Sequence, residues 1–296
     1  MATIYTHQDR NILKTWVLMS SFFIAVIGIG WVFSYVLDEP GILPIAVILS
    51  IVMNVGSYWF SDKLVLSMSG AKLADEREYR DLHNIVENLA ITAGLPKPKV
   101  YIMNEAAPNA FATGRNAKHA VVAVTTGLLA ILDRAELEGV LAHELSHIGN
   151  RDMLVSTIAV VLVGFVTLLS DFFLRASAFG GNNRDNKAGG FLIIAGIVLA
   201  LLSPVIASLM QLAISRKREF LADASGALLT RYPQGLASAL QKIASYSQPM
   251  RRANHATAHL FIANPFGGGK VTGFLTNLFS THPPVEARVK ALLENK

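Results

Sequence analysis

Four long blocks of apolar residues divide the sequence. They cover residues 15–37, 42–60, 153–174 and 191–214, each 19 to 24 residues long, and Asp171 is the only Asp, Glu, Lys or Arg within them. A helix needs roughly 20 apolar residues to cross the hydrocarbon core of a bilayer, whereas long helices of globular proteins normally keep a charged face. The pattern therefore predicts an integral membrane anchor of about four transmembrane helices.

The first block could in principle be a cleaved signal peptide. Its apolar run exceeds the 7 to 15 residues usual for that purpose, and it ends in Asp38-Glu39-Pro40 rather than in a small-residue cleavage site. We therefore interpret it as a retained anchor.

Between the apolar blocks, shorter periodicities predict an α+β unit. Apolar residues at helical spacing favour a helix over 74–93, and short β-rich runs predict strands at 99–103, 109–114 and 119–125. Asp133 and Glu136 have the spacing of a capping box, which predicts that a further helix begins there and runs through residues 142–150. After the last block, residues 215–247 read as helical with a break at Pro233, followed by a Gly- and Asn-rich stretch to residue 281 and a short helix over 284–293.

These elements divide the chain into four parts. Residues 1–61 form an N-terminal membrane anchor, residues 62–152 the first part of an α+β domain, residues 153–214 a hydrophobic hairpin, and residues 215–296 the second part of that domain. The 52% hydrophobic and 16% charged fractions are those of a membrane protein, since charged residues make up about a quarter of soluble domains.

The distribution of basic residues predicts the orientation. Four crossings place residues 1–14, 61–152 and 215–296 on one side, and these segments carry 23 of the 26 Lys and Arg residues. Because loops rich in Lys and Arg stay in the cytoplasm, we expect a multi-pass protein of the cell membrane whose α+β domain and both termini face the cytoplasm. The net charge of +5 accompanies no nucleic-acid motif, so we assign the basic clusters to lipid headgroups.

The most informative motif is His143-Glu144-Leu-Ser-His147. Two histidines four residues apart leave the same face of a helix, so both imidazoles can reach one Zn²⁺ at about 2.0 to 2.1 Å. Glu144 adjoins the first histidine and can hold a water molecule without binding the metal. The alternative is a helix with two surface histidines and a solvated glutamate.

A third ligand follows the apolar hairpin. A catalytic zinc site has three protein ligands and an open position, and Glu219 and Asp223 lie four residues apart on a predicted helix just after the fourth block. An even number of crossings returns this helix to the side of His143 and His147. One carboxylate can then bind zinc while the other orients a ligating imidazole; alternatively, Glu219 is only a charge flanking the membrane.

The chain resembles the HtpX family of membrane-bound zinc metalloproteases, gluzincins related to the type I CAAX prenyl proteases. The resemblance spans nearly the full length and rests on H-E-L-S-H at 143–147, E-F-L-A-D at 219–223, P-N-A-F-A at 108–112 and T-H-P-P-V-E-A-R at 281–288. It implies a zincin-like catalytic domain with one Zn²⁺ per chain, held by His143, His147 and Glu219, with Glu144 as the catalytic base. It further implies degradation of damaged, unfolded or misfolded membrane proteins, a stress-response activity.

Three weaker assignments concern the rest of the site. His282 is a candidate donor to the oxyanion, although it could simply cap a turn. Asn109 and Ala110 lie on a strand that could pair with an extended peptide by main-chain hydrogen bonds, or merely cover the core. His255 and His259 are also four residues apart but lack a third ligand, so we treat them as a structural or substrate-facing pair.

Two alternatives to a protease remain open at this point. A transporter or membrane scaffold could carry an inactive metal motif, but charged residues within the spans would favour it, and only Asp171 qualifies. A zinc hydrolase of non-peptide substrates would use the same chemistry. Natural substrates, cleavage preference, oligomeric state and regulation do not follow from the sequence.

Overall fold

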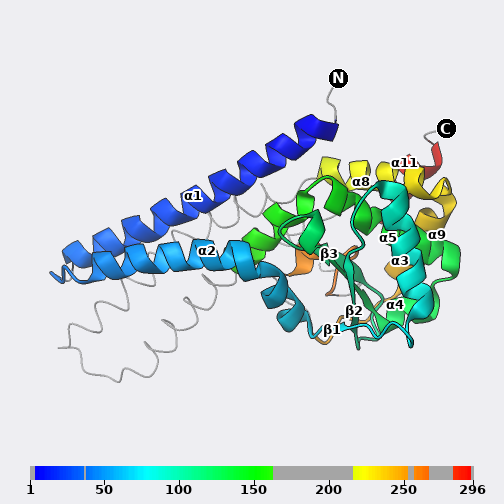
Figure 1. Ribbon diagram of the computed structural model, residues 1–296, viewed down its shortest axis with the longest axis horizontal. Coiled ribbons are helices and arrows are strands. Elements are labelled where there is room, and N and C mark those ends of the chain that lie inside the picture. The colour runs from blue at the N-terminus through cyan, green and yellow to red at the C-terminus, as the bar shows by residue number, and fades with distance from the viewer. Residues whose placement is uncertain (1–3, 37, 163–215, 253–256, 267–282, 295–296) are drawn as a thin grey trace.

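The computed structural model describes residues 4–36, 38–162, 216–252, 257–266 and 283–294. Two long helices, α1 (Ile4–Val36) and α2 (Ile42–Ser69), lie side by side and project from an α+β domain (Figure 1). Residues 11–35 and 42–69 are each long and apolar enough to cross a membrane, judged by length and composition. The first two predicted membrane helices are therefore present as helices.

Helix α2 continues beyond its predicted end at residue 60. Its last turns carry Val65 and Leu66, which are buried beneath the sheet of the α+β domain. Gly70 then ends the helix in the left-handed conformation, with a φ of 65°, which glycine adopts without steric cost. One helix thus serves both as a membrane-length segment and as part of the domain core.

The third apolar block is described only in part. Its first residues, 153–162, belong to a helix that begins at Asp152, and Met153, Val155 and Ile158 on it are buried within the protein. Residues 163–174 and the whole fourth block, 191–214, lie outside the described residues, so the predicted four crossings and the hairpin 153–214 stay a prediction.

The sheet has the strand order β1-β2-β4-β3, from Lys72–Leu73, Lys99–Met103, Val121–Thr125 and Ala110–Thr113 respectively. Strands β2 and β4 are parallel, and the two outer pairs are antiparallel. The three predicted strands are confirmed, each with ends shifted by up to two residues. Strand β1 was not predicted, because two residues are too few to produce an alternating pattern.

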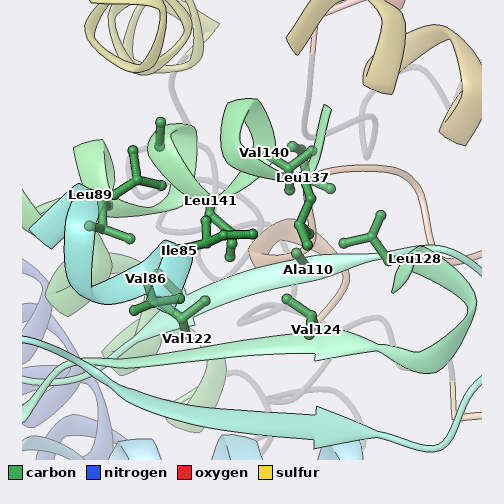
Figure 2. Packing of buried hydrophobic residues seen from close by; sticks show 14 of the residues in the cluster. Ile85, Val86, Leu89, Ala110, Val122, Val124, Leu128, Leu137, Val140 and Leu141 are labelled. Carbon is green, nitrogen blue, oxygen red and sulfur yellow. The ribbon is translucent and has the colours of Figure 1, made fainter. Parts of the chain in front are cut away.

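Alternation along the strands divides the core between the two faces of the sheet. Val122 and Val124 of β4 point toward α3 (Arg80–Ala93) and α5 (Arg134–Gly149), as Figure 2 shows. Val121 and Ala123 instead face the end of α2 and Phe261. The helix with the histidine motif is thereby packed directly on the sheet.

One helix start was predicted wrongly, and one short helix was missed. The helix expected over 74–93 begins only at Arg80, because the Asp75 carboxylate accepts hydrogen bonds from the backbone N–H groups of Arg77 and Glu78 and holds a turn there. Helix α4 (Thr126–Ile131) was not predicted; the Thr125 hydroxyl, at the last residue of β4, caps it by accepting from the Leu128 N–H.

The second half of the domain follows its predicted outline. The predicted helical stretch 215–247 is confirmed as two helices, α8 (Arg216–Thr230) and α9 (Pro233–Ser245), and the break predicted at Pro233 falls at the start of α9. Helix α11 (Val285–Glu294) closes the chain. Short 3₁₀ turns at Ala117–His119 and Ala258–Leu260 complete the described elements.

The predicted capping box of α5 is confirmed, and Glu136 also connects α5 to α9. Its carboxylate accepts hydrogen bonds from Asp133 N (2.9 Å), Ser238 Oγ (2.6 Å) and Lys242 Nζ (2.7 Å), while Asp133 accepts from Glu136 N at 2.9 Å. Burial raises the pKa of Glu136, but the hydrogen bonds from Lys242 and Ser238 outweigh it and lower this pKa below its usual value.

We expect Glu136→Ala to lower the free energy of unfolding by about 2 to 3 kcal/mol, since it removes a cap and charge-assisted bonds from a buried position. The thermal midpoint should fall by several degrees. A lowered carboxyl pKa stabilises the fold at pH values above the unfolded pKa of about 4.3, and this contribution is lost as the pH falls further.

The matched control is Glu138→Ala, on the same helix. Glu138 pairs with Arg134 at 3.1 Å, and both side chains are solvent-exposed, so its loss should change stability by no more than about 0.5 kcal/mol. Thermal unfolding of both variants in detergent would show whether the loss of stability is specific to Glu136. Equal midpoints would mean that the contacts of Glu136 do not stabilise the fold.

Candidate metal centre

Helix α5 places the two histidines of the motif inside the domain. His143 and Glu144 are 1% and 2% exposed, which excludes the alternative of a solvated helix surface. The Nε2 atoms of His143 and His147 face each other at 3.2 Å. Two nitrogen donors therefore point toward one position on the side of α5 that contacts α8.

Helix α8 brings Glu219 to the same position. Its Oε2 lies 3.8 Å from His143 Nε2, and its Oε1 lies 3.6 Å from His147 Nε2. The approach of the two helices depends on Gly226, where an added Cβ would lie only 2.9 Å from the backbone nitrogen of His143. A glycine in α8 thus permits the close helix contact that carries Glu219 to the histidines.

The three side chains fit a divalent metal ion. Ligands at about 2.0 to 2.1 Å in a tetrahedral arrangement lie about 3.3 Å apart. The observed separations of 3.2, 3.6 and 3.8 Å come close to this value, and one donor atom from each residue lies within 4.8 Å of the others. The set of two imidazoles and one carboxylate suits zinc and leaves a fourth position open.

Each imidazole is oriented by a carboxylate on its other nitrogen. Asp223 Oδ1 lies 2.9 Å from His143 Nδ1, and Asp152 Oδ2 lies 3.2 Å from His147 Nδ1. A carboxylate at Nδ1 fixes the tautomer that presents Nε2 to a metal. Asp223 has the contact expected for a residue that orients a ligand, whereas Asp152 was missed because its position directly after the turn offers no helical spacing to His147.

A buried arginine in turn holds Asp223. Arg288 is 1% exposed and donates to both carboxylate oxygens of Asp223, from Nε at 2.8 Å and from Nη2 at 2.6 Å. Burial raises the pKa of Asp223, but the bonds with Arg288 and His143 outweigh it and lower this pKa to about 2. Sequence reasoning gave Arg288 no role. The available signal was its place on the apolar face of the last helix, between Val285, Val289 and Leu292.

The two histidines differ in their electrostatic surroundings. Burial lowers the pKa of His143 to about 4. Burial also lowers that of His147, but Asp152 and Glu219 outweigh it and raise this pKa to about 9. Because a metal binds the neutral imidazole, metal binding has to displace a proton from His147.

Glu144, the carboxyl group of the motif, is buried between the two histidines and the sheet. Burial raises its pKa to about 7, opposed in part by His147 and by a hydrogen bond from the backbone N–H of Ala112. Ala112 belongs to β3, one of the two edge strands of the sheet. Glu144 therefore lies between the metal ligands and the strand predicted to bind a peptide.

The start of β3 is in contact with a later segment of the chain. The Asn109 side chain donates to Ala263 O at 3.0 Å and accepts from Ala263 N at 3.2 Å, and the Ala110 carbonyl accepts from Ile262 N at 3.0 Å. Strand β3 lies at an edge of the sheet, and at Ala110 that edge is already bonded to Ile262. The roles of Asn109 and Ala110 in substrate binding stay a prediction.

The structure describes only one of the three other candidate histidines. His282 and His255 lie outside the described residues. His259 is buried in the 3₁₀ turn Ala258–Leu260, and its Nε2 lies 3.2 Å from the carbonyl oxygen of Ser156. This contact agrees with the structural interpretation of His259.

Comparison with known proteins identifies relatives of this chain by family model and by sequence. The model of peptidase family M48 matches residues 76–296. Proteins named "Protease HtpX homolog" are similar over nearly the whole chain. That of Caldanaerobacter subterraneus subsp. tengcongensis is 46% identical over 297 residues, covering 98% of this chain and 97% of that protein. That of Thermococcus kodakarensis is 50% identical over 282 residues, covering 95% and 94%.

Among solved structures, the crystal structure of S. mikatae Ste24p has a similar fold. The TM-score is 0.51 at 18% sequence identity, and the match covers 98% of this chain and 67% of that one.

Proposed function

The chain belongs to peptidase family M48 and is a homologue of HtpX, and on this premise we propose that it binds one zinc ion and cleaves damaged or misfolded membrane proteins at the cytoplasmic face of the cell membrane. It is a metalloendopeptidase with a His-His-Glu metal site. The zinc, the substrates and the side of the membrane belong to the proposal.

One observation carries the proposal. Side chains from α5 and α8, whose sequences are separated by 66 residues (150–215), meet at one point, and each imidazole has its Nδ1 against a buried carboxylate. A surface helix with two histidines would not have this arrangement. We assign His143, His147 and Glu219 as ligands and Asp223 as the residue that orients His143.

Glu144 is proposed as the general base. A bound zinc ion would supply Lewis-acid activation of a water molecule and of the scissile carbonyl. The Glu144 carboxylate would take a proton from the attacking water and pass it to the leaving amine nitrogen. A base works best with a pKa near the working pH, and burial raises that of Glu144 to about 7. The Ala112 N–H holds this carboxylate in place.

The two N-terminal apolar helices anchor the protein in the membrane. Their basic flanks, Arg10 and Lys14 at the start of α1, support a cytoplasmic catalytic domain under the positive-inside rule. A site held against the membrane would reach segments of misfolded membrane proteins that leave the bilayer. An edge strand recognises such segments through their backbone, with little dependence on sequence.

The proposal predicts zinc-dependent cleavage by the full chain in detergent. We expect the metal-stripped protein to be inactive, and one zinc per chain to restore cleavage of a heat-denatured membrane protein faster than of its folded form. Glu219→Ala should hold well below one zinc per chain, because two imidazoles remain where the site has three ligands. Zinc content by mass spectrometry and cleavage on gels are the measurements.

Glu138→Ala is the matched control, since it removes an exposed glutamate from the same domain. It should keep one zinc and full activity. Full zinc occupancy in Glu219→Ala would place the third ligand elsewhere. Equal cleavage of folded and denatured substrate would overturn the proposed substrate class while leaving the zinc site in place.

A further inference from the structure

The first membrane helix begins in direct contact with the outer layer of the metal centre. Asn11 of α1 is 5% exposed. Its Nδ2 donates to Asp152 Oδ1 at 2.6 Å and to the Asn150 carbonyl at 3.0 Å. Both hydrogens of this amide group are therefore donated to residues of the turn that follows the helix with the histidine motif.

Asp152 connects this amide to a metal ligand. One of its oxygens accepts from Asn11, and the other lies 3.2 Å from His147 Nδ1. Arg218 of α8 approaches the first oxygen at 3.8 Å. Asp152 is 4% exposed, so its position is set by these protein contacts with little competition from solvent.

The turn that carries Asp152 is held by the same amide. Asn150 follows the last residue of α5, and Arg151 then adopts a φ of 57°, a left-handed conformation that is unfavourable for a residue with a Cβ. Only after this turn does the helix Asp152–Leu162 begin. The bond from Asn11 to the Asn150 carbonyl therefore fixes the turn at the point where it places Asp152.

Apolar packing extends the contact into the membrane-length part of α1. Leu18 and Phe22 pack against Val155, Ile158, Ala159 and Leu162. The Asn11 contact thus lies at the end of a continuous interface between α1 and the helix that follows the motif. A shift of α1 along this interface would move the amide away from Asp152.

We propose that α1 is part of the metal centre as well as a membrane anchor, and that Asn11 is a positioning residue that orients the His147 imidazole through Asp152. This proposal rests on the metal site of the proposed function. Asn11 holds Asp152, which orients His147, just as Arg288 holds Asp223, which orients His143. The state of the anchor and the affinity for metal are then coupled.

The test is the zinc affinity of the full chain in detergent, measured by competition with a chromophoric chelator. Removing a residue that contacts a ligand typically weakens metal binding about 10- to 100-fold, and we expect this for Asp152→Ala. Asn11 acts one contact further out, so Asn11→Ala should weaken zinc binding about 3- to 10-fold. In Co²⁺-loaded protein the visible spectrum should shift with it, because ligand geometry changes.

Thr15→Val is the matched control. Thr15 is equally buried one turn further along α1, at 3% exposed, but its hydroxyl donates to the Asn11 carbonyl within the same helix. We expect its zinc affinity and cobalt spectrum to equal those of the parent. The thermal midpoint of the metal-free protein, measured for both variants, reports any loss of folding. If Asn11→Ala does not fold, Asn11→Ser removes the same donor with a smaller change in polarity.

A double-mutant cycle separates positioning from a general loss of stability. If Asn11 acts through Asp152, Asn11→Ala should not weaken zinc binding further in the Asp152→Ala background. An equal loss in both backgrounds, or no loss in the parent background, would overturn the proposal. If the parent bound no zinc, or if His147→Ala bound it equally well, the metal site itself would be wrong, a result distinct from a failure of the Asn11 contact alone.

Discussion

Replacing Glu144 with glutamine is expected to lower kcat/KM for peptide cleavage by about 10³-fold while zinc binding stays at one per chain. General acid–base catalysis by a positioned side chain contributes about 10²- to 10⁴-fold. The glutamine has the same shape, and its carbonyl can still accept the hydrogen bond from the Ala112 N–H. It cannot take up a proton, so the loss should fall on kcat.

The measurement is cleavage of an unfolded polypeptide by zinc-loaded parent and variant, with zinc content and thermal midpoint determined on the same samples. Glu138→Gln, an exposed glutamate on the same helix, controls for the substitution itself and should keep full activity. Retention of most activity in Glu144→Gln would remove this residue from the proton transfer. Loss of zinc together with activity would make Glu144 a structural residue of the site.

Much of the site could be predicted because its chemistry is encoded in short spacings. His143 and His147 share a helix face, and the capping box at Asp133 marks where that helix begins. Glu219 and Asp223 repeat the four-residue spacing on the second helix. Such patterns depend only on helix geometry, so they can be read without knowledge of the packing.

The residues that were missed are defined by long-range packing. Asn11 and Asp152 are 141 positions apart in the chain, and Arg288 and Asp223 are 65 apart. Neither pair produces a recognisable spacing in the sequence, because each joins elements that meet only in the folded protein. The one usable clue was a basic residue, Arg288, on an apolar helix face, since a buried charge requires a partner.

The apolar pattern was ambiguous for a different reason. A membrane helix and a helix buried in a protein core both lack charged residues. In the third block, where the sequence predicted a transmembrane helix, Val155 and Ile158 are buried against Leu18 and Phe22 of α1, a contact that a membrane-spanning helix and a core helix could both make. Composition shows that these residues avoid water but does not show whether lipid or protein replaces it.

The two ligand histidines receive support from opposite ends of the chain. His143 depends on Asp223 and Arg288, and His147 depends on Asp152 and Asn11. The site is therefore complete only when the anchor helix α1 and the last helix α11 are both docked on the pair α5 and α8. Metal binding should stabilise this docked arrangement, because a ligand stabilises the state that binds it.

Arg288→Met is expected to lower the free energy of unfolding of the metal-free protein by about 3 to 5 kcal/mol. Methionine has nearly the volume of arginine, so packing changes little. The effect comes from Asp223, whose side chain is only 2% exposed and would lose its charged partner Arg288 while staying buried. Zinc affinity should also fall, since the carboxylate that orients His143 would no longer be held.

The pH dependence follows from the lowered pKa of Asp223, about 2 in the folded protein. A lowered carboxyl pKa stabilises the fold fully above the unfolded pKa of about 3.9, and this stabilisation is lost as the pH falls toward the folded value. In Arg288→Met the isolated carboxyl group should protonate more readily. The stability difference between parent and variant should therefore be largest at neutral pH and shrink in acid.

Two further variants make this prediction specific to the buried pair. Lys290→Met removes a basic residue from the same helix, but Lys290 is 69% exposed and pairs weakly with Glu294 at 3.8 Å, so stability should change by no more than about 0.5 kcal/mol. Adding Asp223→Asn to Arg288→Met should restore part of the lost stability, because it removes the unpaired charge. If thermal unfolding in detergent showed Arg288→Met to be as stable as Lys290→Met, Arg288 would not stabilise Asp223, and the support of His143 would have to come from its remaining contacts.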